Sequence, residues 1–452
     1  MRGVLEVLIG VVTQPAILLG IIACLGLLLQ KKKFNEVVTG SVKTFLGFLV
    51  LTGGSGIISD ALIPFSEMIE HSFQVQGVVP SNEAIAAIAL AEYGSLAALI
   101  MVVGMAVNIL LSRFTRFKYI FLTGQIMLFI SLITTIVMVG AGFEFNIWTV
   151  LLGGIFAGTM QTVTPAIQQK YMVQVMGTDD VAMGHSGGIG YALSGFLGGK
   201  LGNKEKSTEQ IKMPDKLTFM KDTNVAIAVV MAIIYIAIAL IAGPTFVETL
   251  SDGTNYIIFA LEQAGTFAAG VYIVLAGVRL ILGEIVPAFK GISDKLVPDA
   301  KPALDCPVTF PFAPNALLIG FLCSFGAGLI SMLIMIAAGT TIIVPGIVPH
   351  FHCGGTAGIF GNATGGRKGC IIGATLYGIF TSFLPLVSLP FLGNISSASS
   401  TFSDLDLLIQ AIGLGAVGDY GIPMIVTAIL GFFTIVLLFS VFLNRREKTK
   451  AA

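Results

Sequence analysis

The chain of 452 residues is strongly apolar. Hydrophobic residues make up 55% of it and charged residues only 11%, against roughly 25% charged in soluble globular proteins. Lysine plus arginine and aspartate plus glutamate each number 25, so the formal net charge is zero. These figures exclude a soluble globular enzyme, a disordered chain and a nucleic-acid-binding protein, which would need a basic face. They predict an all-α polytopic membrane protein.

Long apolar segments predict the membrane-spanning helices, because a bilayer core of about 30 Å needs roughly 20 apolar residues per helix. The strong candidates are 14–30, 90–111, 119–141, 147–167, 224–246, 257–280, 315–338, 369–391 and 424–443. The weaker ones are rich in glycine or interrupted by polar residues, and they are 44–63, 182–200, 281–298 and 341–366. We expect about ten to twelve crossings together with re-entrant or in-plane segments.

A polar loop at 203–222 divides the chain into a first membrane half, 1–202, and a second, 223–452, with no polar stretch long enough for a soluble domain. A weak internal repeat supports two related halves. Residues 43–64 and 279–298 each carry a basic residue, a glycine four positions later, and a Gly-Ile-Ser-Asp-type ending that closes on proline. Duplicated halves are typical of transporters, whose substrate sites lie between the halves at broken helices. Whether the halves are inverted is left open.

Basic clusters indicate which ends of the helices face the cytoplasm. They lie at Lys31–Lys33, Arg113–Lys118 and Arg445–Lys450, and the positive-inside rule places them on the cytoplasmic side. The positive-inside rule does not decide on which side of the membrane residues 182–222 lie. The sequence contains no phosphate-binding loop of the Walker type, so we expect energy to come from an ion gradient or from a separate partner.

Ionisable side chains in apolar segments are the best pointers to a site, because each costs roughly 2.5–3.5 kcal/mol in a membrane. Asp305 lies in a segment broken by Pro307, Pro311 and Pro314, which frees backbone groups to meet a polar ligand. It is predicted to accept hydrogen bonds from substrate hydroxyls, the alternatives being a helix cap or an ion pair. His185 has glycines on both sides, and it can both donate and accept near neutral pH. The alternative for His185 is a structural histidine.

Weaker candidates lie in other interrupted segments. Asn82 and Glu83 follow a Val-Val-Pro-Ser stretch, where the spacing favours a helix cap over a site. Gln125 is an uncharged donor and acceptor within a strong span. Gly54 and Ser55 belong to a small, polar stretch that is either a break in the helix or a place of tight helix packing.

Residues 342–366 contain too many glycines and prolines for one straight helix, and they predict a re-entrant hairpin or gate. His350, His352 and Cys353 fit the spacing of no standard zinc site, so we expect no metal. No nucleophile–base pair or cofactor motif is visible, and no cofactor is expected. The polar residues together indicate recognition of a small solute rich in hydroxyl groups.

Several short motifs are more specific than these separate features. Asp305-Cys306 followed by Phe312-Ala313-Pro314-Asn315-Ala316 is the most specific of them. Others are Gly53-Gly54-Ser55-Gly56, Pro80-Ser81-Asn82-Glu83-Ala84, Leu122-Thr123-Gly124-Gln125, Gly184-His185, Gly198-Gly199-Lys200-Leu201-Gly202-Asn203-Lys204-Glu205 and Val344-Pro345-Gly346. In these motifs the chain resembles, nearly end to end, the membrane IIC subunit of the ascorbate-type phosphotransferase systems, in the ascorbate–galactitol superfamily.

The resemblance implies a homodimer in the lipid of a bacterial cell membrane. Each subunit would have about eleven transmembrane helices, divided between a dimer-side scaffold and a substrate-holding core that moves as a rigid unit past it. A cytosolic IIB partner, phosphorylated on its own cysteine through IIA, HPr and enzyme I from phosphoenolpyruvate, would phosphorylate the sugar held in this subunit. The membrane chain itself would then carry no phosphorylated cysteine.

Carried over to this sequence, the resemblance implies a site formed by Gly54, Ser55, Asn82, Glu83, Gln125, His185, Ser186 and Asp305, with Phe351 and His352 as additional candidates. Asp305 would accept a hydrogen bond or proton from the hydroxyl to be phosphorylated. The chain departs from close ascorbate transporters by having Gln125 in place of histidine and fewer polar groups at Phe129 and Ser186. The solute is therefore ascorbate, a related sugar acid, a pentose or a polyol. An ion-coupled secondary transporter, a channel and a membrane scaffold are the rival functions.

Overall fold

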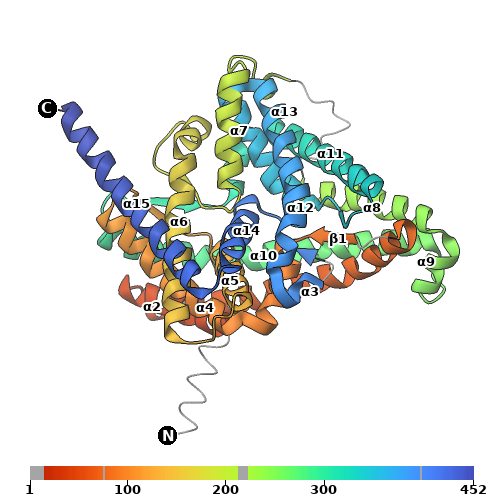
Figure 1. Cartoon of the computed structure of the whole chain (residues 1–452), viewed down its shortest axis with the longest axis horizontal. Coiled ribbons are helices and arrows are strands. Elements are labelled where there is room, and N and C mark those ends of the chain that lie inside the picture. Colours follow the sequence, from red (N-terminus) through yellow and green to blue (C-terminus); the bar gives the residue numbers. More distant parts are fainter. Residues whose placement is uncertain (1–14, 75–76, 212–221, 398–399, 452) are drawn as a thin grey trace, which may run out of the picture.

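The computed structural model of the chain describes residues 15–74, 77–211, 222–397 and 400–451. Helices form nearly all of this part (Figure 1). The helices are α2 (Pro15–Leu29), α3 (Phe34–Phe73), α4 (Asn82–Phe114), α5 (Gly124–Gly140), α6 (Ile147–Met176), α7 (Gly188–Leu201), α8 (Thr223–Ala242), α9 (Pro244–Leu250), α10 (Tyr256–Leu296), α11 (Pro314–Ala338), α12 (Ile347–Pro349), α13 (Gly355–Ser388), α14 (Leu405–Gly418) and α15 (Ile422–Ala451).

Among the described residues, seven helices are long and apolar enough to cross a membrane, or eight when α8 and α9 count as one span bent by 112°. This confirms a multi-pass helical protein that contains a broken helix pair. The expected number of about ten to twelve crossings also counts shorter apolar helices such as α5, within the predicted span 119–141, and it stays an expectation. The short apolar helix α14 was not among the predicted spans.

The two copies of the internal repeat lie in α3 and α10, which pack against each other in opposite directions. Near one end, Lys43 Nζ lies 3.0 Å from Glu284 Oε1. Further along, a Cβ atom on Gly270 would lie 2.8 Å from Ile58 Cγ1, so the backbones approach closely. The structure also joins 257–280 and 281–298, predicted as separate spans, into the single helix α10, because packing along α3 supports its whole length.

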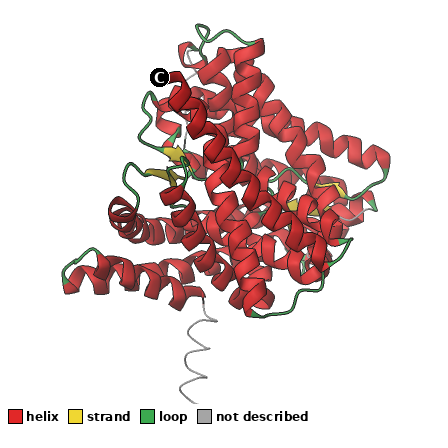
Figure 2. Ribbon diagram, turned by 60° about the vertical axis from the view of Figure 1, so that its left-hand side comes forward, coloured by secondary structure: helices red, strands yellow, loops and turns green. Residues whose placement is uncertain are grey.

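Within the described ranges, six short strands form two three-stranded parallel sheets, an addition to the predicted all-α fold (Figure 2). The strands are β1 (Gly77–Pro80), β2 (Tyr119–Phe121), β3 (Ala182–Met183), β4 (Lys301–Leu304), β5 (Ile342–Ile343) and β6 (Ser400–Thr401). Their orders are β5-β1-β6 and β2-β4-β3. In each sheet the central strand and the two edge strands come from opposite sides of the 203–222 loop. These pairings satisfy backbone groups where the helices are interrupted.

The segment 342–366 is broken as predicted. It contains β5, α12 and a π-helical turn at His350–Gly354, and it ends in α13 at Gly366, whose φ of 59° and ψ of −150° are not helical. A Cβ atom on Gly361 would lie 2.3 Å from the carbonyl oxygen of Gly369. Residues eight apart in one continuous helix lie about 12 Å apart, so α13 folds back on itself as a helical hairpin.

Close approach at glycines fixes this hairpin against α7 and α11, with which it forms the upper bundle in Figure 1. A Cβ atom on Gly365 would lie 2.2 Å from the carbonyl oxygen of Gly198, and one on Gly378 would lie 2.2 Å from that of Ser324. The start of the connecting loop also docks here, because Glu209 accepts hydrogen bonds from the amides of Asn315 (3.1 Å) and Ala316 (2.8 Å) at the start of α11.

The substitution Gly366→Ala tests the hairpin turn. Its backbone conformation is one that essentially only glycine adopts, and the new Cβ would lie 2.3 Å from the Asn203 carbonyl oxygen. We expect a loss of at least about 1–3 kcal/mol of stability, measured as a lower melting temperature of the purified protein in detergent. Gly199→Ala is the matched control, because its Cβ would meet only an ordinary contact at 3.8 Å. Equal melting temperatures for the two variants would contradict the hairpin.

Candidate functional site

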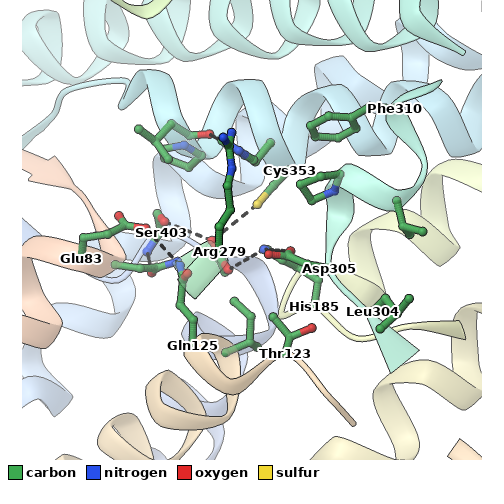
Figure 3. Close-up of a pocket in the computed structure, with 18 of the residues that line it drawn as sticks. Glu83, Thr123, Gln125, His185, Arg279, Leu304, Asp305, Phe310, Cys353 and Ser403 are labelled. Carbon is green, nitrogen blue, oxygen red and sulfur yellow. Dashed lines mark hydrogen bonds and ion pairs between the residues drawn. The ribbon is translucent and has the colours of Figure 1, made fainter. Parts of the chain in front are cut away.

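A cavity of about 570 Å³ lies where the carboxyl ends of the strands in both sheets meet (Figure 3). Each of the six strands ends at, or is shortly followed by, a residue that lines the cavity. These lining residues are Asn82 and Glu83 after β1, Thr123 and Gln125 after β2, His185 after β3, Asp305 after β4, Val348 and Pro349 after β5, and Ser403 and Asp404 after β6. The two sheets thus bring polar residues from distant parts of the chain around one space.

His185 lies between two carboxylates. Its Nε2 atom is 3.7 Å from Asp305 Oδ1 and 3.7 Å from Asp404 Oδ2. Its Nδ1 atom is 3.1 Å from the hydroxyl of Tyr191, a fully buried residue whose hydroxyl is also 3.2 Å from Cys306 Sγ. When Tyr191 donates to Nδ1, the imidazole hydrogen is on Nε2 and points toward the carboxylates. The ring is therefore held in place from behind while its other edge faces the cavity.

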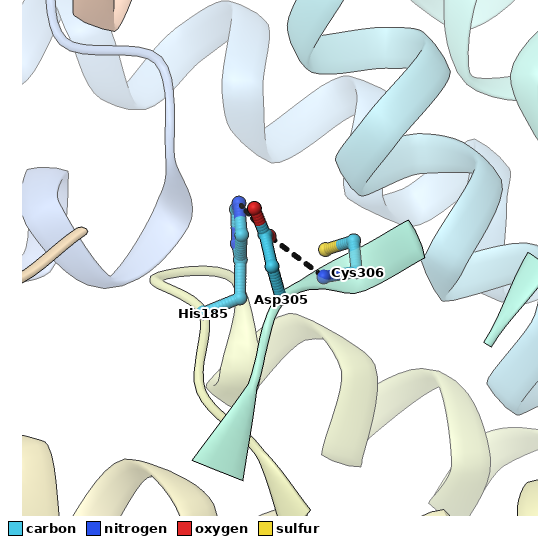
Figure 4. A group of neighbouring side chains, drawn as sticks. All are labelled: His185, Asp305 and Cys306. Atoms are coloured by element: carbon cyan, nitrogen blue, oxygen red, sulfur yellow. Dashed lines mark hydrogen bonds and ion pairs between the residues drawn. The ribbon is translucent and has the colours of Figure 1, made fainter. Parts of the chain in front are cut away.

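Asp305 is both a cap and a free acceptor. Its Oδ1 atom accepts a hydrogen bond of 2.7 Å from the amide of Cys306, which begins a short 3₁₀ turn (Figure 4). Its Oδ2 atom has no hydrogen bond among the described residues, and its side chain lines the cavity. The cap alternative thus holds for one oxygen only, and the second oxygen is available to a ligand.

Asp404 is a central residue of the site that the sequence analysis missed. It is 1% exposed and accepts hydrogen bonds from the hydroxyl groups of Ser186 and Ser403. Cys353 Sγ lies 3.5 Å from its Oδ1 atom. Asp406, also buried, accepts hydrogen bonds from the first amides of α7, at Gly188 (2.9 Å) and Ile189 (3.0 Å). The signal that could have found both is a pair of acids at the start of the short apolar helix α14, one directly before it and one in its first turn.

Asn82 and Glu83 line the cavity although the helix cap beside them is Ser81, whose hydroxyl accepts from the Ala84 amide at 3.3 Å. Asn82 Oδ1 accepts a hydrogen bond of 2.9 Å from the amide of Ser403, which follows β6, the strand that pairs with β1 in the same sheet. Glu83 Oε1 accepts one of 3.3 Å from Gln125 Nε2. The predicted Glu83 and Gln125 are therefore partners of each other.

Other predicted site residues lie away from the cavity. Gly54 lies in α3, which continues without the predicted break, and its carbonyl oxygen faces Gly270 of α10, so the helix-packing alternative applies. The side chain of Ser55 lies outside the described residues. Phe351 is 1% exposed and packs against Phe310 and Phe321.

Two further predicted residues, His352 and Ser186, lie at the cavity or directly behind its wall. His352 lines the cavity, and its Nδ1 atom is 3.2 Å from the Val348 carbonyl oxygen. Ser186 is 1% exposed and lies behind the cavity wall, where it binds Asp404.

Two side-chain groups around His185 have the composition of metal ligands. One contains Asp305 and Cys306 with His185, and the other contains Cys353 and Asp404 with it. In both groups the sulfur atom already has a protein partner, Tyr191 for Cys306 and Asp404 for Cys353. These contacts join both groups into one polar network around His185.

An ion pair joins the first residue of β4 to the loop that precedes β3. Lys301 Nζ lies 2.5 Å from Asp179 Oδ2, and Gln169 Nε2 donates to Asp179 Oδ1 at 2.8 Å. Hydrogen bonding by Lys301, and then by Gln169, lowers the pKa of Asp179 from its ordinary value. The pKa of Asp179 is therefore lower in the folded chain than in the unfolded chain. The stability that Lys301 and Gln169 contribute through Asp179 is fully present above the unfolded pKa, and it is lost as the pH falls through the folded pKa.

Comparisons with known proteins place the chain beside a family of transport proteins. A family model described as "PTS system sugar-specific permease component" matches residues 10–406. The chain is also similar to the "Ascorbate-specific PTS system EIIC component" of Mycoplasma pneumoniae, with 27% identity over 451 residues. That alignment covers 87% of this chain and 67% of the relative.

The substitution Asp404→Ala tests the hydrogen-bond network behind the cavity. It leaves two buried serine hydroxyl groups without their acceptor, at a cost of about 1–3 kcal/mol for each donor that finds no other partner. We expect a clearly lower melting temperature in detergent. Asp60→Ala is the matched control, since Asp60 is exposed on α3 and has no hydrogen bond or ion pair among the described residues. A melting temperature for Asp404→Ala equal to that of the control would refute the network.

Proposed function

The chain belongs to the sugar-specific permease family of the phosphotransferase system (PTS), and on this premise we propose that it carries an ascorbate-like sugar acid. The observation that supports this most is the convergence of six strand ends on one cavity of about 570 Å³. Binding sites for small molecules are typically cavities of about 300–1,000 Å³ with a few well-placed polar groups. The curated relative from Mycoplasma pneumoniae, named as ascorbate-specific, supports the choice of solute.

In this proposal Asp305 takes part in the chemistry. Its free Oδ2 atom would accept the hydrogen of the sugar hydroxyl while the oxygen of that hydroxyl attacks the phosphorus atom on the cysteine of the IIB partner. The bond between phosphorus and the cysteine sulfur breaks as the new oxygen–phosphorus bond forms, and the sulfur leaves as a thiolate. General-base help of this kind contributes about 10²–10⁴-fold to a rate. His185 and Gln125 would hold the sugar ring, each with one edge in the cavity and the other fixed by a protein partner.

The phosphate would come from a IIB partner, phosphorylated on its own cysteine and supplied through IIA. The absence of a Walker-type loop from the sequence supports an external source of energy. Two cysteines of this chain that lie close to the cavity, Cys306 and Cys353, are buried and hydrogen-bonded, which does not suit a phosphoryl carrier that must meet a soluble protein.

Transport would occur by movement of a core past a scaffold in a homodimer. The long helices α3 and α10 cross the lower part of Figure 1 and form the proposed scaffold, while α7, α11 and α13 stand above them as part of the core. The antiparallel direction of α3 and α10 and the exchange of strands between the sheets support two related, inverted halves.

Vesicles that contain the purified chain, with IIA, IIB, HPr, enzyme I and phosphoenolpyruvate on the cytosolic side, test the proposal. We expect labelled L-ascorbate to appear as a phosphate ester on that side. Asp305→Asn should lower its rate of formation by at least about 100-fold, because an amide cannot take the proton. Asp60→Asn serves as the control. Unchanged phosphorylation by Asp305→Asn would remove Asp305 from the chemistry, and accumulation of unmodified solute on an ion gradient would favour a secondary transporter.

A further inference from the structure

We propose that Arg279 receives the negative charge of the transported solute, so that the solute is an anionic sugar rather than a neutral polyol. This inference rests on the proposed function, since it concerns the solute bound in the same cavity. The inference assigns the specificity of the site to Arg279, which comes from the helix α10 and not from a segment that follows one of the strands.

Arg279 lines the cavity and is exposed to it (Figure 3). Among the described residues around the cavity, it is the only arginine or lysine, and it has no hydrogen bond or ion pair. A guanidinium within a membrane protein is costly and usually has a counter-charge. An unpaired one beside a polar cavity therefore indicates that the counter-charge comes with a ligand.

The acids near Arg279 already have other partners. Glu284, on the same helix, binds Lys43 at 3.0 Å. Asp222 lines the cavity but caps α8, accepting hydrogen bonds from the amides of Asn224 (3.0 Å) and Val225 (3.2 Å).

Three other carboxylates line the cavity, and each accepts at least one hydrogen bond, with Oδ2 of Asp305 left free within the described part of the chain. Glu83 accepts hydrogen bonds from Ser81 and Gln125, Asp404 from two serine hydroxyls, and Asp305 from the Cys306 amide. No protein carboxylate among the described residues forms an ion pair with Arg279.

The cavity thus offers two kinds of group to one solute. The carboxylates and Gln125 accept hydrogen bonds, which suits the hydroxyl groups of a sugar. Arg279 offers a planar set of donors, which suits a carboxylate or the delocalised oxygens of an acidic enediol. A neutral polyol would use the acceptors but leave the guanidinium without its anion, and such unmatched groups are a strong source of discrimination.

Arg279 also places a positive charge among the carboxylates of the cavity. Four carboxylates line it, from Glu83, Asp222, Asp305 and Asp404. Without an opposing cation these groups would repel an anionic solute. The single guanidinium provides the local attraction that lets an anion bind among them.

Binding of L-ascorbate and galactitol to the purified full chain in detergent, without the partner proteins, tests the inference by calorimetry. The wild type should bind L-ascorbate more tightly than galactitol. Arg279→Gln should weaken L-ascorbate binding about 10- to 100-fold, as expected for the loss of a charged hydrogen-bonding pair. Arg279→Lys should bind with intermediate affinity, and galactitol binding should change little in either variant. Arg113→Gln, at an exposed arginine of α4, is the matched control.

Unchanged binding of L-ascorbate by Arg279→Gln would overturn the inference, as would tighter binding of galactitol than of L-ascorbate by the wild type. L-Ascorbate 6-phosphate separates the two sources of negative charge. If Arg279→Gln weakens only the binding of this ester, the guanidinium serves the phosphate, and the inference is wrong.

The two proposals fail in different ways. If the vesicle system phosphorylates galactitol but not L-ascorbate, transport coupled to phosphorylation stands and the assignment of Arg279 falls. If no sugar is phosphorylated and solute accumulates on an ion gradient, the proposed function falls.

Discussion

The whole site depends on one constraint, which is that backbone groups at membrane depth need hydrogen-bond partners. Each place where a helix is interrupted exposes such groups. Here the interruptions pair with one another as two small parallel sheets. Because parallel strands end at the same edge, the pairing also gathers the side chains that follow each strand around one cavity. The same hydrogen bonds that make broken helices tolerable thus build the polar site.

The exchange of strands between the two sides of the 203–222 loop adds a mechanical consequence. Each sheet holds strands from both sides, so neither half of the chain can form its part of the cavity alone. The connecting loop strengthens this by docking Glu209 on the start of α11, and Asn362 of the hairpin accepts a hydrogen bond of 2.9 Å from the Thr208 amide. The polar groups around the cavity are therefore held in a rigid frame, as a site that distinguishes similar solutes requires.

Much of this could be predicted from the sequence. Apolar segments of sufficient length indicated a multi-pass helical protein, and the repeat marked α3 and α10 as related. The prolines around Asp305 and the glycines around His185 located two cavity residues, because broken helices and ionisable groups are rare in membranes unless they serve a site. The glycines of 342–366 likewise indicated a break, which the structure places in a π-helical turn and at Gly366.

The sheets and half of the polar wall could not be predicted. Strands of two to four residues carry no periodic pattern, so nothing marked their pairing in advance. Asp404, Ser403 and Arg279 acquire their place only through tertiary structure, since residues from Asn82 to Asp404 meet at one cavity. Gly54 is a different case, because its sequence left a site and helix packing open, and the structure places it where the second long helix α10 lies against α3.

The central claim is that the space between the two sheets is where the sugar binds. The most direct measurement is a structure of the full chain in lipid nanodiscs with saturating L-ascorbate, determined by electron cryomicroscopy. The account predicts density for the sugar within hydrogen-bonding distance of Asp305, His185 and Gln125. Ligand density elsewhere, with this cavity empty or closed by side chains, would contradict it.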